Sequence, residues 1–421
     1  MSSAYSNALS GLTANSNAIN IVSGNLANLS TAGYKDQQVS FEDLVNESIS
    51  GFTNTSSISG SVLAQGTQQF TQGTLETTGN PYDAAIQGGG FFVVDTTAGT
   101  PLYTRQGNFD VNAAGQLVTA TGQFVQGWNN VNGTLNTGGL TSNIVVPTDL
   151  TSPPVASTQF SASANLSANV VFGATPPATF SSPVQVYDSV GNPHNLTITY
   201  TAGSTPGNWN YAITIPSADL ASPTTPPTAL ASGTLTFDST GTLTSPAAGS
   251  GPIAITVPTL ADGGAFASAL NWNLYSPTGA STLTQFASAS VNNGTTQDGS
   301  SAGLPTSVGI GANGEVVAKF SNGNSEVVAQ IALASVLNPD SMQQLDGNTF
   351  APTSLTAKPT VGVPSTGALG SITGGTLETS TVDIASEFTH LLEYERGYQA
   401  NSKVITTEDQ VVQQTIALIT G

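Results

Sequence analysis

The two ends of the chain carry long heptad patterns, and these restrict the fold more than any other feature of the sequence. The N-terminal pattern advances by alternating steps of three and four residues through Tyr5, Ala8, Leu12, Asn15, Ile19, Val22, Leu26 and Leu29. This spacing is typical of a helix whose apolar stripe packs against another helix. The helix is expected to end within residues 28–33, because Gly33 can take the left-handed conformation of a C-cap.

The C-terminal segment repeats the pattern over a longer stretch. Its members are Ile384, Phe388, Leu391, Glu395, Tyr398, Ser402, Ile405, Asp409, Val412, Ile416 and Ile419. Ser380 and Asp383 resemble a capping box at the start of this helix. A second row of Val404, Val411 and Leu418 widens the apolar band, which indicates contact with more than one neighbouring helix. An ordinary amphipathic helix explains either end alone, but matched patterns at both ends favour helix assembly.

The large apolar members of the two patterns define a predicted assembly seam. These residues are Tyr5, Leu12, Ile19, Val22, Leu26, Leu29, Ile384, Phe388, Leu391, Tyr398, Ile405, Val412, Ile416 and Ile419.

Between the helices the pattern is that of β-structure. Strands are expected around Ala85–Ile86, Phe91–Val94, Val184–Tyr187, Leu196–Tyr200, Leu235–Phe237 and Glu326–Leu333, separated by Gly, Pro and Asn turns. Pro- and Thr-rich loops from about 146 to 281 indicate a β domain inserted into another. The fold class predicted is mixed α and β and multidomain, with terminal α-helical coiled-coil segments flanking nested all-β domains.

The sequence pattern predicts seven parts of the chain. They are an N-terminal helix (1–30), an extended or β connector (31–71), the first half of a β domain (72–147), an inserted outer β domain (148–284), the second half of the first β domain (285–358), a connector (359–379) and a C-terminal helix (380–421).

Charge excludes two classes of partner. The chain has 25 acidic and 6 basic residues and a net charge of −19. The basic residues are scattered singly, so no patch can neutralise a run of phosphates, and nucleic acid and anionic membrane surfaces are not expected partners. No apolar run is long enough to cross a bilayer, so no membrane insertion is expected.

The chain has no cysteine, which excludes disulfides, thiolate metal sites and cysteine nucleophiles. The absence of cysteine also suits a protein that leaves the reducing cytosol. No basic residue precedes Lys35 and no apolar segment follows Met1, so a cleaved secretory signal is not expected. An exported chain of this kind would use a route that spares its N-terminus.

No enzyme site is expected. Of the two histidines, His194 lies after a turn sequence and is expected to face solvent, and His390 is expected on a helix surface. The segment 309–314 matches a dinucleotide-binding glycine pattern, but a strand and a hairpin turn follow it where a helix is required. We therefore predict no catalytic residue, no cofactor-binding residue and no metal ligand.

Two terminal segments carry a family resemblance. Residues 25–35 read Asn-Leu-Ala-Asn-Leu-Ser-Thr-Ala-Gly-Tyr-Lys and resemble the N-terminal signature of flagellar rod and hook proteins. Residues 394–405 resemble the C-terminal signature of the same family. The signature residues are Asn25, Ala27, Asn28, Gly33, Tyr34, Lys35, Tyr398, Gln399, Ala400 and Asn401. Ser30, Glu395 and Gly397 depart from the usual Asn, Gln and Ala.

Internal segments are also similar to this family. Residues 72–92, 103–109 and 125–128 resemble segments shared by rod and hook proteins, whereas 186–194 and 320–324 resemble segments of hook proteins. The resemblance implies a structural subunit, with no enzymatic activity and no cofactor, that polymerises into the flagellar hook, the flexible tube that transmits torque in bacterial motility.

The same resemblance implies the partners and the location. The partners would be other copies of the chain in a helical homopolymer, rod and hook–filament junction proteins, a hook cap protein and the flagellar type III export apparatus. The location would be the bacterial flagellum, in the hook next to the basal body and outside the cell. Two alternatives stay open: a distal rod protein of the same family, and a secreted carbohydrate-binding or adhesive β-sandwich protein.

Overall fold

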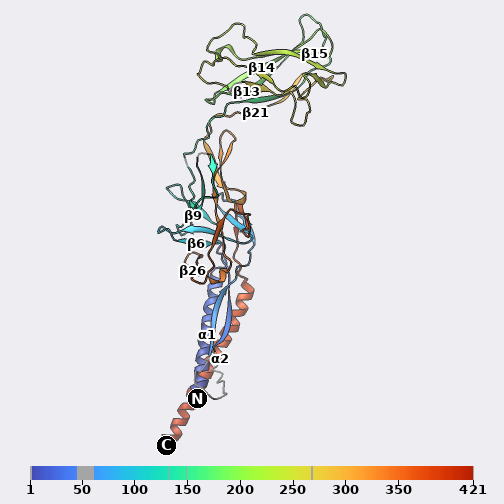
Figure 1. Cartoon of the computed structure of the whole chain (residues 1–421). Coiled ribbons are helices and arrows are strands. Elements are labelled where there is room, and N and C mark those ends of the chain that lie inside the picture. The colour runs from blue at the N-terminus through green and yellow to red at the C-terminus, as the bar shows by residue number, and fades with distance from the viewer. Residues whose placement is uncertain (1, 45–60, 132, 148, 267–268, 421) are drawn as a thin grey trace. The chain divides into compact units, whose positions relative to one another are not determined.

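The computed structural model describes residues 2–44, 61–131, 133–147, 149–266 and 269–420 (Figure 1). The chain forms two compact units. Unit 1 comprises Met1–Thr148, Ser307–Ala318 and Ser325–Gly421, and unit 2 comprises Asp149–Thr306 and Lys319–Asn324. Helices at both ends flank a β-rich body, so the predicted fold class is confirmed.

Both predicted terminal helices are present in unit 1: α1 (Ser2–Ala27) and α2 (Ile384–Thr420). α1 ends at Ala27, so the expected C-cap role of Gly33 was wrong; Gly33 lies six residues further on, at the end of the turns that follow the helix, and has a left-handed φ of 66°. The predicted capping box was wrong in its cap residue. Asp383 is the N-cap, and its Oδ1 accepts a hydrogen bond from the backbone N–H of Ser386 at 2.9 Å. Ser380 lies too early in the chain and accepts instead from Val382 at 3.3 Å.

The two helices lie side by side and antiparallel (Figure 1). At the contact each helix places a glycine under an asparagine of the other, Gly11 under Asn401 and Gly397 under Asn15. Each asparagine donates its side-chain amide to the glycine carbonyl one turn earlier in its own helix, at 2.7 Å for Asn15 and 3.0 Å for Asn401. Small residues thus let the helix backbones approach closely while the polar side chains stay hydrogen-bonded.

This contact predicts different effects on helix stability for two glycine-to-alanine substitutions. A Cβ at Gly397 would lie 2.4 Å from Oδ1 of Asn15, whereas a Cβ at Gly24 meets nothing within 4 Å. We expect Gly24→Ala to stabilise the helix by about 1 kcal/mol. Gly397→Ala is expected to lose this gain, because Asn15 must move and give up a hydrogen bond worth about 1 kcal/mol. Amide hydrogen exchange in α1 and α2 measures the difference, and equal protection in both variants would contradict it.

An antiparallel pair, β1 (Gln37–Leu44) and β2 (Ser61–Gln68), packs against α1. The largest sheet has the strand order β22 (Pro305–Ile310), β23 (Glu315–Phe320), β24 (Ser325–Ile331), β9 (Phe124–Val131), β5 (Phe91–Asp95), β6 (Pro101–Thr104), β27 (Thr349–Ala351) and β26 (Gln343–Leu345). Its side branches are β7 (Phe109–Val111), β8 (Leu117–Thr119), β10 (Thr134–Leu135), β11 (Ser142–Asn143), β25 (Leu333–Ser335) and β28 (Thr360–Gly362).

Two short strand pairs complete unit 1 and join early and late parts of the chain. They are β3 (Leu75–Thr77) with β30 (Thr376–Glu378), and β4 (Ala84–Gln87) with β29 (Ser371–Gly374).

The described residues of unit 2 form two five-stranded sheets. One has β18 (Ile253–Ile255), β19 (Leu270–Trp272), β12 (Gln159–Asn165), β20 (Leu283–Thr284) and β21 (Val291–Gln297). The other has β13 (Thr179–Tyr187), β14 (Pro193–Ala202), β15 (Asn208–Thr214), β16 (Ala231–Phe237) and β17 (Leu243–Ser245).

The core of unit 2 comes from alternate residues of these strands and includes the fully buried Tyr200 and Trp272. Unit 2 continues past residue 284, where the inserted domain was expected to end, because β21 pairs with β12.

Candidate assembly surface and buried junction

The contact between α1 and its neighbours is made mostly by small side chains. Ala8, Ala14, Ala18 and Val22 are buried on α1. Ala14 and Ala18 form a cluster with Ala64 of β2, against which Val39 of β1 and Tyr394 of α2 pack. Burial of methyl groups rather than large side chains keeps the helices close and leaves the bulkier residues beside the contact.

The structure separates the N-terminal seam residues by exposure. Val22 is buried, and Leu12, Ile19, Leu26 and Leu29 are half-buried. Tyr5 is exposed, as is Leu9 next to the pattern, with 42% and 46% of their surfaces accessible. The seam of α1 is therefore only partly used within the chain.

On α2 more of the seam is exposed. Leu391, Ile405 and Val412 are half-buried. Ile384, Phe388, Tyr398 and Ile416 are exposed, and so are Leu392, Val404, Val411 and Leu418 outside the seam. The side chain of Ile419 lies outside the described residues. An exposed row of large apolar side chains on one helix marks a surface that can bury them against another protein.

Several signature residues lie where α1 meets the β body. Asn25 is fully buried and joins α1 to β1: its Oδ1 accepts from Gln37 N at 3.0 Å and from the Tyr34 hydroxyl at 3.2 Å, and its Nδ2 donates to Gln37 O at 2.8 Å. Asn28 donates to Gly24 O at 2.9 Å and closes the last turn of α1. These asparagines thus set the direction in which the chain leaves the helix.

Gly33 is required by a close backbone approach as well as by its positive φ. A Cβ at this position would lie 2.5 Å from the carbonyl oxygen of Arg105. The Gly33 N–H donates to the Glu378 carbonyl at 2.7 Å, and the Thr381 N–H donates to the Tyr34 carbonyl at 3.2 Å. The segment after α1 is therefore paired with the segment before α2.

A buried ionic cluster lies at the same place. The carboxylate of Glu378 accepts from Lys35 Nζ at 2.7 Å, from the Gly73 N–H at 2.7 Å and from Gln72 Nε2 at 3.1 Å. Arg105 NH1 lies 3.5 Å from its other oxygen. Lys35 and Glu378 are fully buried, and their side chains, with that of Arg105, form what we call the junction cluster.

Burial lowers the pKa of Lys35 and that of Arg105, and the Glu378 carboxylate opposes the shift in both. Arg105 also donates to Gly88 O at 2.8 Å and lies over the ring of Phe91, 5.4 Å from its centroid. The junction cluster therefore ties together four distant parts of the chain around one carboxylate. Lys35 was singled out from the sequence, but its partners were not, because nothing in the local pattern around Glu378 or Arg105 indicates an ion pair.

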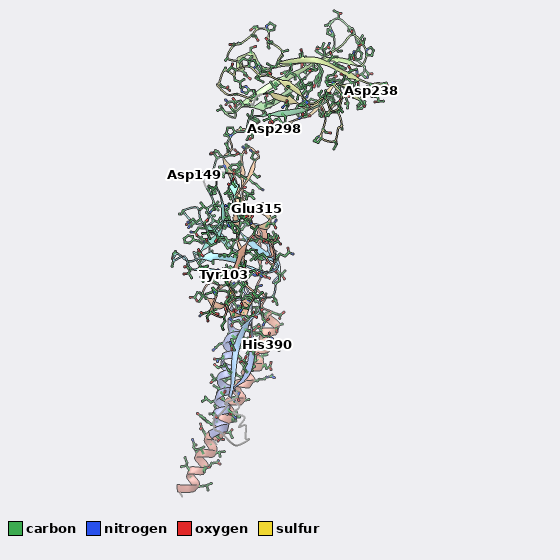
Figure 2. All side chains as sticks on the ribbon, viewed as in Figure 1. Tyr103, Asp149, Asp238, Asp298, Glu315 and His390 are labelled. Atoms are coloured by element: carbon green, nitrogen blue, oxygen red, sulfur yellow. The ribbon has the colours of Figure 1, made fainter. Side chains whose placement is uncertain are left out.

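Other signature residues lie at the surface. Ala27, Tyr398, Gln399 and Ala400 are exposed, whereas Asn401 is half-buried at the α1 contact. His390 lies on α2 (Figure 2) and is half-buried. Its ring stacks on that of Tyr394, with 6.1 Å between the ring centroids. The signature residues therefore fall into two groups: some form the buried junction, and others lie on an exposed face of a helix.

The expectation that His194 faces solvent was wrong. His194 is 4% exposed and lies on β14, with carboxylates of Asp188, Asp219 and Asp262 around its ring. The alternation of β14 could have indicated this, because His194 is in phase with the buried Leu196 and Ile198. The three aspartates come from separate loops, so their convergence has no signal in the sequence.

The described helices include none that is both long and apolar enough to span a bilayer.

Family models match most of the chain in four segments. They are described as Flagella basal body rod protein (residues 6–35), Flagellar hook protein FlgE/F/G D1 domain (85–158), Flagellar basal body protein FlaE D2 domain (165–300) and Flagellar basal body rod FlgEFG protein C-terminal (373–418).

Curated relatives match nearly end to end. The chain is 30% identical to the flagellar hook protein FlgE of Borreliella burgdorferi, with 99% of each chain covered. It is 29% identical to FlgE of Escherichia coli, with 99% of this chain and 100% of the relative covered. A crystal structure of the hook protein FlgE2 of Helicobacter pylori matches with a TM-score of 0.48 and 18% identity, covering 72% of this chain and 100% of that one.

Proposed function

The chain belongs to the family of flagellar hook proteins, and on this premise we propose that its two terminal helices carry the surface through which copies assemble into the hook. The protein is a structural subunit of the bacterial flagellar hook, in a family that polymerises in the flagellum. We infer from the same membership that it has no catalytic role.

One observation carries the proposal. Ile384, Phe388 and Leu392 leave 48%, 48% and 56% of their surfaces exposed, although α2 already packs on α1. Burying a large apolar side chain fully contributes about 1.5–3 kcal/mol. Burying the exposed halves of three such side chains against another subunit would therefore contribute several kcal/mol to assembly. Repetition of that contact in every subunit would stabilise a polymer.

The absence of cysteine allows a direct test of this surface. Leu392→Cys would place one thiol on the exposed face of α2, and Ser204→Cys would place one on an exposed loop of unit 2. We expect a maleimide to label both variants as monomers but to label Leu392→Cys much more slowly in sedimented polymer. Equal labelling of Leu392→Cys in monomer and polymer would contradict the proposed surface.

We further propose that unit 2 is dispensable for helix assembly. The segments entering and leaving it lie side by side, because Ser152 bridges Gly303 and Val155 bridges Ser300. Replacing residues 156–299 by a two-residue turn is therefore expected to leave unit 1 folded and able to form tubes. Electron microscopy of the shortened chain checks this, and loss of the unit 1 fold by circular dichroism would count against independent domains.

Family membership also supports the remaining partners. We propose that the chain contacts rod proteins at one end of the hook, junction proteins at the other and a cap during growth. The flagellar type III apparatus would export it. The near full-length matches to hook proteins favour the hook over the distal rod.

A further inference from the structure

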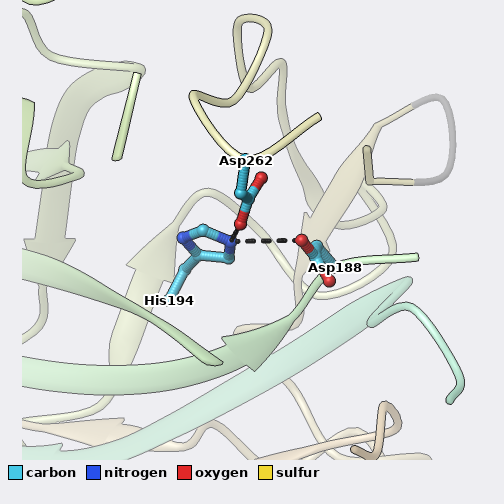
Figure 3. Close-up of side chains that lie close together, drawn as sticks. All are labelled: Asp188, His194 and Asp262. Carbon is cyan, nitrogen blue, oxygen red and sulfur yellow. Dashed lines mark hydrogen bonds and ion pairs between the residues drawn. The ribbon is translucent and has the colours of Figure 1, made fainter. Parts of the chain in front are cut away.

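Three donor atoms of unit 2 converge on one point (Figure 3). They are His194 Nε2, Asp188 Oδ2 and Asp262 Oδ2, and all lie within 4.8 Å of one another. Asp188 and His194 flank the turn between β13 and β14, and Asp262 lies on the loop that follows Leu260. The side chains of Asp188 and His194 are 0% and 5% exposed, so this point is largely shielded from water on the side of the sheet.

The distances from His194 Nε2 fit ligands of a shared ion better than they fit hydrogen bonds, while Asp262 Oδ2 also accepts from Asn192 Nδ2 at 2.9 Å. Nε2 lies 3.5 Å from each of the two oxygens, which is longer than the usual 2.7–3.2 Å of an N–H···O hydrogen bond. Zinc binds imidazole nitrogen and carboxylate oxygen at about 2.0–2.2 Å. Two ligands at that radius are about 3.5 Å apart when they subtend an angle of about 110°, as in a tetrahedral site.

The groups around this point hold the donors in place. The other ring nitrogen, Nδ1, lies 3.0 Å from Asp219 Oδ2, and a carboxylate in this position directs Nε2 as a ligand. Asp188 Oδ1 accepts from the N–H groups of Val190 and Asn192 at 2.9 and 2.8 Å. Oδ2 makes longer contacts, with Asn192 Nδ2 at 3.4 Å and His194 Nε2 at 3.5 Å. Burial alone would raise the pKa of Asp188, but these hydrogen bonds outweigh it and the pKa is lowered.

The charges around this point also favour a bound cation. Residues 149–306 contain no Lys or Arg, so no basic side chain of this stretch can balance the carboxylates of Asp188, Asp219 and Asp262. A protonated His194 would offset one of the three negative charges, whereas a divalent cation would offset two.

We propose that unit 2 binds one divalent transition-metal ion, with Zn²⁺ as its representative, through His194 Nε2, Asp188 Oδ2 and Asp262 Oδ2. Asp219 orients the imidazole from behind. The ion joins the β13–β14 turn to the loop that carries Asp262. That turn packs against Pro154 and Ser301 through Gly191, so the ion stiffens the end of unit 2 at which the chain enters and leaves.

The test is calorimetric titration of the full-length monomer with ZnCl2 after chelator treatment, in excess Mg²⁺ to occupy the acidic surface. We expect one saturable site per chain and a higher melting temperature for unit 2 with Zn²⁺. Asp262→Asn is expected to weaken binding more than tenfold, and Asp219→Asn about 10- to 100-fold. Asp149→Asn, which changes the charge equally at an exposed position outside the cluster (Figure 2), should leave the affinity unchanged.

Three results would overturn the proposal. The first is no saturable Zn²⁺ binding in excess Mg²⁺, which would leave His194 in contact with the carboxylates alone. The second is equal affinity in Asp262→Asn and Asp149→Asn, which would mean non-specific binding. The third is Zn²⁺ binding that survives in the double variant Asp219→Asn, Asp262→Asn, provided that circular dichroism shows this variant to be folded.

Discussion

Phe388→Asp is expected to abolish polymer formation while leaving the melting temperature of the isolated subunit unchanged. Phe388 is 48% exposed on α2, so the fold of the monomer depends little on its outer half. In the proposed assembly the substitution removes about 1 kcal/mol of apolar burial and adds the desolvation of a carboxylate, at least about 2 kcal/mol. Together these raise the concentration needed for assembly by about 100-fold or more.

The matched control is Thr389→Asp, one residue further along α2. Thr389 is exposed outside the predicted seam, and its side chain is turned about 100° around the helix from that of Phe388. Sedimentation and electron microscopy should show polymer for this control and none for Phe388→Asp at the same concentration. Normal tube yield from Phe388→Asp would mean that the assembly surface lies on another face of α2.

Glu378→Gln is expected to destabilise unit 1 by about 3–5 kcal/mol, the usual result of removing one partner from a buried ion pair. The substitution keeps the shape of the side chain but leaves Lys35 and Arg105 as buried cations without their carboxylate. Hydrogen exchange under increasing urea measures the loss separately in each unit, and unit 2 should be unaffected.

Glu76 provides the control for this substitution within the same strand pair. It lies on β3, which pairs with β30, and its side chain is exposed. Glu76→Gln should change the free energy of unfolding by less than about 0.5 kcal/mol. Adding Lys35→Met to Glu378→Gln removes one unpaired cation and should restore part of the lost stability. Equal stability of Glu378→Gln and Glu76→Gln would show that the cluster contributes nothing.

The junction cluster lies where both terminal helices meet the β body of unit 1. Glu378 lies a few residues before α2, and Lys35 lies a few residues after α1. The ion pair between them therefore holds the base of both helices against the β body of unit 1.

Local patterns in the sequence were sufficient to place both terminal helices and several of the strands. The heptad patterns predicted α1 and α2, since a stripe of apolar residues at helical spacing stabilises a helix only if one face is buried. Alternating residues in 196–200 predicted β14, and the Asn-Gly turn after residue 320 predicted the connection from β23 to β24. The signature segments predicted the family, because they combine many specific residues in a fixed order.

Only the tertiary structure decided which side chains meet. Glu378 and Lys35 are 343 positions apart, and Asp188, Asp219 and Asp262 come from different loops, so no periodicity in the sequence links them. The antiparallel approach of Gly11 to Asn401 likewise depends on how the two helices are held at their base. Secondary structure follows from neighbours within a few residues, whereas ion pairs and candidate ligand sets depend on distances that the folded backbone alone creates.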